Sequence, residues 1–293
     1  MTLDVRLFAK EVGAPLAAVC RALSLPRSTM YARENSTLSA RAVDTVELDA
    51  EIRGVFESNQ GRTGSPRVHR ELRRRGRRVG RKRVAARMKK LGLVARRRKR
   101  FRRTTQADPA HVPAPNLLDR RFDWSEPNQA WVGDITYILT VAGWVYLALL
   151  VDLCTRKAVG WALSKNCDTD LALRALRNAV ARERPPPGLL HHTDRGSTYT
   201  AKGYQDELKR LGMTVSMSRK GNCWDNAVAE STIGTVKTEA LDPLGLPADI
   251  NEVQRILFPY IEGYYNHQRL HSTLGYMPPA EKEKAIANAA HAA

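Results

Sequence analysis

Hydrophobic and polar positions follow two different periods in the second half of this 293-residue chain. Runs rich in β-branched and aromatic residues at 129–140, 143–153 and 157–164 predict three successive strands, which can pair as an antiparallel meander. Beyond them, apolar residues at helical spacing predict helices that alternate with short strands. These helices cover 168–184, 200–211 and 226–241, and the short strands cover 189–193 and 213–217.

The first half of the chain is predicted to be helical. In residues 14–33, apolar residues at helical spacing precede a break at 24–26, and Ser28 is placed to cap a second helix. This helix-turn-helix pattern is found in DNA-binding domains and in other helical domains alike. Residues 48–94 repeat the pattern with more charge, and their last predicted helix ends at Gly92. We expect a small winged-helix-like or helix-turn-helix unit whose last helix contacts DNA, with helices at 51–57, 68–75 and 80–91.

Charge is concentrated in one segment of the chain. The formal net charge is +18, and residues 62–103 hold 21 Lys or Arg with one acid, Glu71, so this segment carries +20 and the rest −2. Such a basic module attracts a polyanion, because neutralised phosphates release their condensed counterions. An acidic membrane surface is the alternative ligand. The seven basic residues around Phe101, at 96–103, are placed to follow a phosphate backbone.

Together the two halves predict an α/β protein in which all-α helix-turn-helix modules precede a ribonuclease-H-like catalytic core. The order of three strands, then helix, strand, helix, strand, helix gives a five-stranded mixed sheet with flanking helices. Prolines at 109, 113 and 115 indicate an extended linker. The predicted domains are an N-terminal helix-turn-helix at 1–47, a basic helix-turn-helix DNA-binding domain at 48–103, the linker at 104–121, the core with a C-terminal extension at 122–284 and a tail at 285–293.

Composition argues against several protein classes. No apolar run approaches the ~20 residues that span a bilayer, and residues 1–10 carry Asp4, Arg6 and Lys10 rather than a secretory hydrophobic region. We therefore expect a cytoplasmic protein without membrane association, which joins the nucleoid when it binds DNA. The four cysteines are scattered without a CxxC pair, which favours reduced, mostly buried thiols over a zinc site or disulfides.

Three acids mark the predicted chemical site. Cutting a phosphodiester needs an activated oxygen nucleophile and a stabilised leaving oxygen, which two divalent cations held by carboxylates provide. Asp134 lies within an otherwise apolar predicted strand, Asp194 follows the strand at 189–193, and Glu230 lies on the helix at 226–241. Each acid taken alone also has an ordinary explanation, such as a local backbone bond, a turn cap or a solvated helix position. Their combination favours a metal site.

The sequence around these acids resembles a known family. Asp194 and Glu230 have 35 residues between them, as in the D,D,35-E pattern of retroviral integrases and many bacterial transposases. Over about residues 50–285, the chain is similar to the second-frame (OrfB) DDE transposases of insertion-sequence family three. The motifs that carry this resemblance are GSPRVH at 64–69, HTDRGSTY at 192–199, GNCWDNA at 221–227 and YNHQRLHSTLGY at 265–276, followed by Pro278.

The resemblance implies an integrase-type core with Asp134, Asp194 and Glu230 as catalytic residues and ligands of two Mg²⁺ ions, with Mn²⁺ able to substitute. It implies cleavage and strand transfer at terminal inverted repeats, through a copy-out route with a circular intermediate. The implied partners are double-stranded DNA, both as element ends and as target, and the first-frame (OrfA) product. That product carries a leucine zipper in the family, and the present sequence shows no heptad run. Because two DNA ends must be joined, we also expect at least one further copy of the chain.

Further residues are candidates for binding DNA or for shaping the site. Asp152 is interpreted as an auxiliary acid or as a structural turn residue. His192 is interpreted as a residue that positions a water or phosphate near Asp194, or as a packed or hydrogen-bonded residue. Near the third acid, we expect Asp225 or Asn226 to cap the helix, and Trp224 to pack beneath the site or to stack on an unpaired base. Arg195 and Arg219 are further candidates for contacting DNA phosphates. We expect Asn266 and His271 either to face DNA or to pack on the core. The predicted DNA contacts are Arg67, Arg81, Lys82, Arg83, Arg87, Lys90, Arg97, Arg98, Lys220, Lys237 and Arg269.

The sequence therefore predicts a DNA transposase acting in DNA recombination and integration. In this polynucleotidyl transferase, attack by water leaves a 3′-hydroxyl that then attacks another phosphodiester directly. Two other classes stay open at this point. A DNA-binding regulator with an inert core would need only the basic domain, and the three acids at integrase spacing argue against it. A ribonuclease-H-type nuclease or junction resolvase would share the fold and the metals, and it offers no reason for two N-terminal DNA-binding modules.

Overall fold

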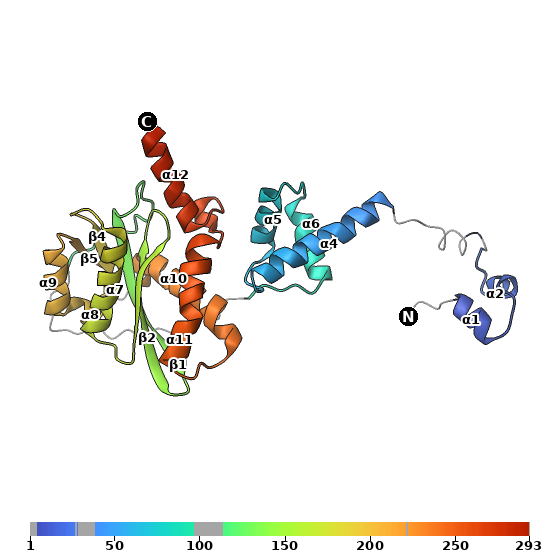
Figure 1. Cartoon of the computed structure of the whole chain (residues 1–293), viewed down its shortest axis with the longest axis horizontal. Helices are drawn as coiled ribbons and strands as arrows, with labels where there is room; N and C mark the ends of the chain where they lie inside the picture. Colours follow the sequence, from blue (N-terminus) through green and yellow to red (C-terminus); the bar gives the residue numbers. More distant parts are fainter. Residues whose placement is uncertain (1–4, 27, 29–38, 97–113, 221, 293) are drawn as a thin grey trace.

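The computed structural model describes residues 5–26, 28, 39–96, 114–220 and 222–292 (Figure 1). The chain begins with two short helices, α1 (Val5–Glu11) and α2 (Leu16–Ala22), which pack through Ala9 and Val19. The predicted first helix of the N-terminal module is therefore present as α2. Its predicted partner lies almost entirely outside the described residues.

Three helices form the basic domain. They are α4 (Ala40–Ser58), α5 (Ser65–Arg74) and α6 (Arg81–Lys90), and they enclose a core that includes Leu48, Ile52, Val68, Leu72, Val84 and Met88. Helix α4 begins well before the predicted start and runs through residue 47, where the sequence suggested a domain boundary. Its first turn is capped by the Ser39 hydroxyl, which accepts a bond from the Ala42 N–H at 3.2 Å. Residues 39–96 contain no strand, so this part of the domain is a three-helix unit without a wing.

A five-stranded mixed sheet forms the centre of the second half. Its strands are β1 (Ala130–Thr140), β2 (Gly143–Asp152), β3 (Ala158–Ser164), β4 (Leu190–Thr193) and β5 (Thr214–Met217), in the order β3-β2-β1-β4-β5. The first three pair antiparallel as predicted, and β4 and β5 add in parallel beside β1. This is the predicted ribonuclease-H-like arrangement.

Helices cover both faces of the sheet (Figure 1). One face packs against α7 (Thr169–Glu183), α8 (Ser197–Thr200) and α9 (Lys202–Arg210). The other packs against α10 (Ala227–Val236), α11 (Ile250–Phe258) and the π-helical segment η4 (Pro259–Tyr265). Close to the first face, a Cβ built on Gly160 of β3 would lie 2.5 Å from the Ala175 carbonyl oxygen, so helix α7 approaches β3 as closely as glycine permits.

The C-terminal part continues from α10 as a series of helical segments. Shorter helical turns flank α10 and η4, and the last helix, α12 (Pro279–Ala292), covers most of the predicted tail at 285–293. None of the helices in the described ranges is long and apolar enough to cross a membrane. The shorter segments are η1 (Cys223–Asn226), η2 (Lys237–Leu241), η3 (Asp242–Leu244) and η5 (Ser272–Leu274).

Candidate active site

The first acid lies on β1, and the second directly follows the neighbouring parallel strand β4. The register of β1 with β4 pairs Val132 with His192. Asp134 comes two residues after Val132, and Asp194 comes two residues after His192, so the two acids lie side by side. Side chains two residues apart in a strand point to the same face. Because Val132 faces the core beneath α10 and α11, Asp134 is directed to that face as well. The parallel pairing therefore brings two distant carboxylates to one place.

The third acid comes from the helix that covers this face. Glu230 lies in the first turn of α10, and its side chain is exposed. The start of this helix is attached to β1, because the Asn226 side-chain amide donates to the Gly133 carbonyl at 3.0 Å, one residue before Asp134. Asn226 thus holds the N-cap position, but it makes no side-chain capping bond, contrary to expectation. Its side chain ties the helix to the sheet instead.

Besides burial, the charges of the other two acids contribute to a raised pKa of Asp134. Burial, followed by the negative charges of Asp194 and Glu230, raises the pKa of Asp134 well above its ordinary value. Burial also raises the pKa of Asp194, although the Gly196 N–H, which donates to its Oδ1 at 3.0 Å, opposes the shift. Carboxylates that repel one another in a buried place are suited to a bound cation, which supplies the missing opposite charge.

The side chains of the three acids do not form a preassembled ligand set. Within the described ranges, no three His, Cys, Asp or Glu side chains are arranged to hold a metal ion. The donor chemistry nevertheless fits Mg²⁺ or Mn²⁺, because both ions prefer carboxylate oxygens, and Mg²⁺ takes only a few of them while keeping several waters. The assignment of these residues as ligands is taken up below as a proposal.

The loop that leads from β5 into the Glu230 helix is fixed by a buried acid. Asp225 is fully buried, and its carboxylate accepts bonds of 2.9–3.0 Å from the Arg219 backbone and guanidinium, from Arg120 and from Asn116. Asn116 and Arg120 belong to the segment that enters the core from the basic domain. Asp225 therefore fastens this segment to the base of α10, and it does not cap the helix through its side chain.

Known proteins match both halves of the chain. Residues 125–223 and 211–279 match two families described as integrase core domain, and residues 44–101 match a family described as HTH-like domain. The chain is 38% identical to the 31 kDa protein of insertion element IS600 from Shigella sonnei, over 89% of this chain and 96% of that protein. It is 36% identical to the transposase InsF of IS3A from Escherichia coli, over 92% and 93% of the two chains. The chain belongs to the IS3 family of insertion-sequence transposases.

A further relative agrees with this placement, and two solved integrase cores align with about half of the chain. The transposase of IS904 from Lactococcus lactis is 38% identical over 84% of this IS3-family chain and 97% of its own length. The HTLV-2 integrase catalytic core domain in complex with magnesium aligns with a TM-score of 0.42 and 20% identity, over 54% of this chain and 97% of that one. The BIV integrase core aligns with a TM-score of 0.43 and 16% identity, over 56% and 99% of the two chains.

Two residues near the acids have structural roles in this IS3-family core. Asp152 is buried and accepts bonds from the backbone and hydroxyl of Thr155, both at 2.7 Å, and from the Asn128 N–H at 2.8 Å. It therefore shapes the turn between β2 and β3. His192 is fully buried between the hydroxyls of Ser216 and Ser218, at 2.8 and 3.1 Å, and burial lowers its pKa to about 4. Of the two interpretations offered for each residue, the structural one fits.

The predicted DNA contacts on the last helix of the basic domain are mostly exposed. Arg81, Lys82 and Lys90 lie on the open surface of α6. Arg83 also reaches α4, with its guanidinium 2.7 Å from Asp44 and 3.1 Å from the Thr45 hydroxyl. Arg87 pairs with Asp49 of α4, its Nε lying 2.7 Å from Oδ1. Helix α6 thus presents a basic face even though two of its arginines also bind within the domain.

The remaining predicted contacts have varied surroundings. Lys220 is exposed beside the active-site loop, and Arg97 and Arg98 lie outside the described residues. The Lys237 ammonium is half-buried and donates to the Thr136 hydroxyl at 3.1 Å and to the Tyr137 carbonyl, so it attaches the end of α10 to β1. Arg67 and Arg269 take part in contacts between the basic domain and the core. For all of these residues, DNA contact stays a prediction.

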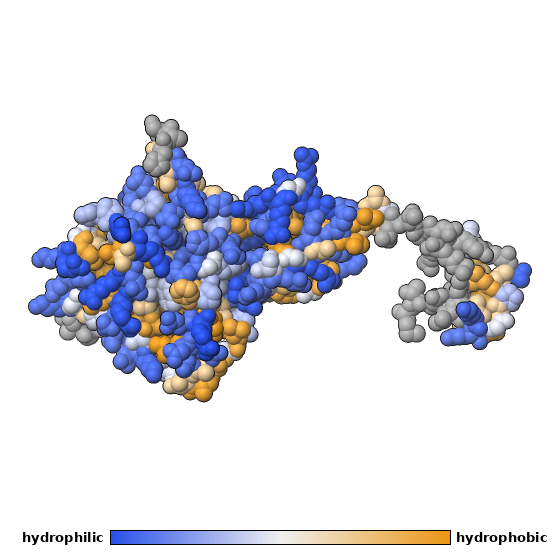
Figure 2. All heavy atoms as spheres, in the orientation of Figure 1, coloured by the Kyte–Doolittle hydropathy of each residue, from blue (hydrophilic) through white to orange (hydrophobic). Residues whose placement is uncertain are grey.

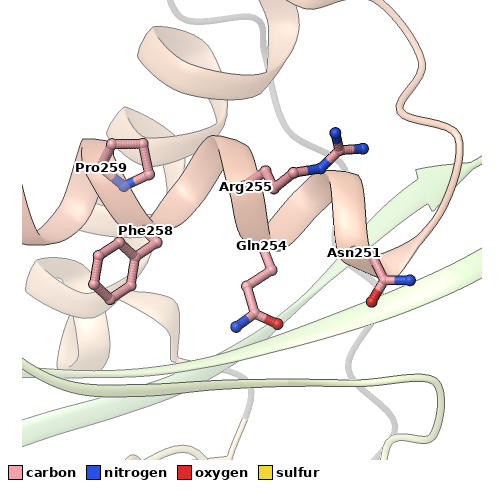
Figure 3. A pocket seen from close by; sticks show the side chains of 5 residues that line it. All are labelled: Asn251, Gln254, Arg255, Phe258 and Pro259. Carbon is pink, nitrogen blue, oxygen red and sulfur yellow. The ribbon is translucent and has the colours of Figure 1, made fainter.

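Trp224 lies six residues before the third acid along the chain. Its side chain is 69% exposed, which fits the stacking interpretation and not packing beneath the site. A shallow hollow of about 490 Å³ lies elsewhere, along one side of α11 (Figure 3). Its walls are Asn251, Gln254, Arg255, Phe258 and Pro259, so none of the three acids lines it.

Proposed function

We propose that this IS3-family chain is a polynucleotidyl transferase that binds the terminal inverted repeats of an insertion sequence, cuts the DNA there and joins the freed end to a target. The observation that carries the proposal is the placement of Asp134 on β1 beside Asp194 at the end of the parallel strand β4, with Glu230 close enough to affect the ionisation of Asp134. Family membership alone indicates DNA transposition. The geometry supports the assignment of these three acids to the chemistry.

In this proposal, Asp134, Asp194 and Glu230 hold two divalent cations, Mg²⁺ with Mn²⁺ able to replace it. When bound, such ions activate an attacking oxygen and stabilise a leaving oxygen. The backbone N–H groups of Ile135 and Gly196 each donate to Oδ1 of the preceding acid, at 2.9 and 3.0 Å, and so orient the first two carboxylates. Glu230 sits on a helix whose start is tied to β1 at Gly133, the residue before Asp134.

The partner in this proposal is double-stranded DNA, both as element end and as target. The exposed residues Arg81, Lys82 and Lys90 of α6 bind its phosphates, and Lys220 contacts DNA near the cleaved bond. Joining two ends in one event requires two active sites, so we propose an assembly of at least two copies on DNA. The first-frame product is a further proposed partner.

The decisive experiment compares Asp134→Asn with Asp206→Asn in the purified full chain, using the DNA ends of its own element. Asp206 is an exposed acid of α9 in the same core, which makes it a matched control. Both variants should bind end DNA like the unmodified protein. Only Asp134→Asn should lose Mg²⁺-dependent cleavage and strand transfer. Joining by Asp134→Asn at the wild-type rate would refute the assignment.

A further inference from the structure

Three arginines on one side of α5 contact the catalytic core, although Arg70 and Arg74 stay partly open to solvent. Arg67, Arg70 and Arg74 follow at intervals of three and four residues, so they share one side of the helix. The Arg67 Nε donates to the Leu270 carbonyl at 2.9 Å, the Arg70 guanidinium lies 5.0 Å from the ring centre of Tyr276, and Arg74 lies 2.7 Å from Glu281. Figure 2 shows the surface of the basic domain continuous with that of the core.

The centre of this contact is a buried acid, Glu239, in the π-helical turn η2. Its carboxylate takes two bonds from Arg269, at 2.8 and 2.9 Å, and one from the Tyr260 hydroxyl at 2.8 Å. Glu239 and Arg269 are each 6% exposed. Burial opposes ionisation of Glu239, but the hydrogen bonds and charge of Arg269 outweigh it, so its pKa lies below the ordinary value. The C-terminal sequence motif thus completes a buried ion pair inside the core.

The basic domain adds three more cations to the same acid. The Arg67 guanidinium lies 3.5 Å from the Glu239 carboxylate. Arg62 and Arg96 donate to the Glu239 backbone carbonyl at 3.1 and 2.6 Å. The Arg62 guanidinium also lies over the rings of Tyr260 and Tyr264, at 5.1 and 4.7 Å from their centres. Glu239 thus contacts both domains, because its carboxylate pairs with Arg269 of the core and Arg67 of the basic domain, and its backbone carbonyl accepts from Arg62 and Arg96. Separating the domains would leave this buried carbonyl without its arginine donors.

Docking leaves the DNA-binding face of the domain open. The contacts come from α5, the loop before it and Arg96, while Arg81, Lys82 and Lys90 of α6 stay exposed. Glu239 follows Glu230 by nine residues on one continuous helical segment, a separation of about 14 Å along its axis at 1.5 Å per residue. The docked domain is therefore connected to the third acid through a rigid element.

We propose that Arg62 and Arg67 are positioning residues: through Glu239 they hold α6 at a fixed distance from Asp134, Asp194 and Glu230, and this distance selects the phosphodiester that is cut. The proposal rests on the proposed function. It gives Arg67 and Arg269 a role in domain docking in place of the DNA contact predicted from their charge.

The test uses the full chain with Arg62→Ala and Arg67→Ala combined. The matched control combines Arg73→Ala and Arg78→Ala, which remove the same charge from the same domain at exposed positions that make no hydrogen bond or ion pair to the core within the described ranges. Small-angle X-ray scattering of the DNA-free chains reports docking. Affinity for end DNA and the position of cleavage, mapped to the nucleotide, report function.

The docking variant should have a larger radius of gyration than the control. It should bind end DNA as tightly as the control, yet cut at several phosphodiesters, with cleavage at the wild-type position reduced about tenfold or more. An unchanged radius with a single wild-type cleavage position would overturn the proposal. So would a much greater loss of DNA affinity than in the control, because the two arginines would then be DNA contacts. If the unmodified chain cuts no end DNA, the proposed function fails, and the scattering comparison alone still decides whether the domains dock.

Discussion

Asp225 offers the sharpest test of how the loop before Glu230 is held. In Asp225→Asn the side chain keeps its shape but loses the negative charge that Arg219, Arg120 and Asn116 bind. Removing one member of a buried ion pair costs about 3–5 kcal/mol. The arginine side chains are 49% and 48% exposed, so they regain water when released and the cost is smaller. We expect about 2 kcal/mol, since the amide oxygen still accepts a bond.

The assay is thermal unfolding of the full chain, followed through the transition of the catalytic core. A loss of about 2 kcal/mol corresponds to a decrease in Tm of about 4–8 °C for a domain of this size. Asp119→Asn is the matched control, because Asp119 also pairs with Arg219, at 3.2 Å, but its side chain is 75% exposed. The control should change the free energy of unfolding by about 0.5 kcal/mol or less. Equal Tm values for the two variants would refute the reasoning.

The same residue predicts a pH dependence. The hydrogen bonds from Arg219, opposed by burial, hold the pKa of Asp225 well below its ordinary value. A depressed pKa in the folded state gives a stability contribution that is present above the unfolded value, about 3.9, and is lost as the pH falls below it. The Tm difference between Asp225→Asn and the unmodified chain should therefore be constant near neutral pH and shrink below about pH 4. A difference that grew on acidification would contradict this sign.

Three further predictions concern packing, metal binding and DNA binding. Gly160→Ala should destabilise the core by about 2–3 kcal/mol in chemical denaturation, because its methyl group would overlap the α7 backbone; unchanged stability would show that α7 shifts freely. Without divalent metal, Asp134→Asn should have a higher Tm than the unmodified chain, since it removes a buried carboxylate that Asp194 and Glu230 repel. Added Mn²⁺ should raise the Tm of the unmodified chain alone. An equal rise in both chains would exclude a metal role for Asp134. The combined Arg81→Ala and Lys82→Ala variant should lower the slope of log affinity against log salt by about 1–2; an unchanged slope would place the DNA elsewhere.

Local pattern predicted the elements of the core closely, for a physical reason. A strand buried on one or both faces requires apolar residues at intervals of two, and a helix requires them at intervals of three and four. The predicted strands at 129–140 and 143–153 became Ala130–Thr140 and Gly143–Asp152. The early start of α4 escaped prediction because Val43 and Val46 are exposed, at 41% and 60%, so they form no apolar stripe with the buried residues further along the helix.

The sequence by itself determined the α/β order of the core, the basic character of residues 62–103, the family and the three candidate acids. The tertiary structure decided which charged groups meet. Arg67 and Lys82 are both basic residues of the same charged segment. Arg67 nevertheless contacts the buried Glu239, whereas Lys82 faces solvent. The buried ion pairs and hydrogen bonds of Asp225 and Glu239 could not be predicted from the sequence. The charge of a side chain is a local property, but its burial and its partners depend on segments more than a hundred residues away. Pairing across such distances is set by how sheet and helices pack, and only the folded chain contains that information.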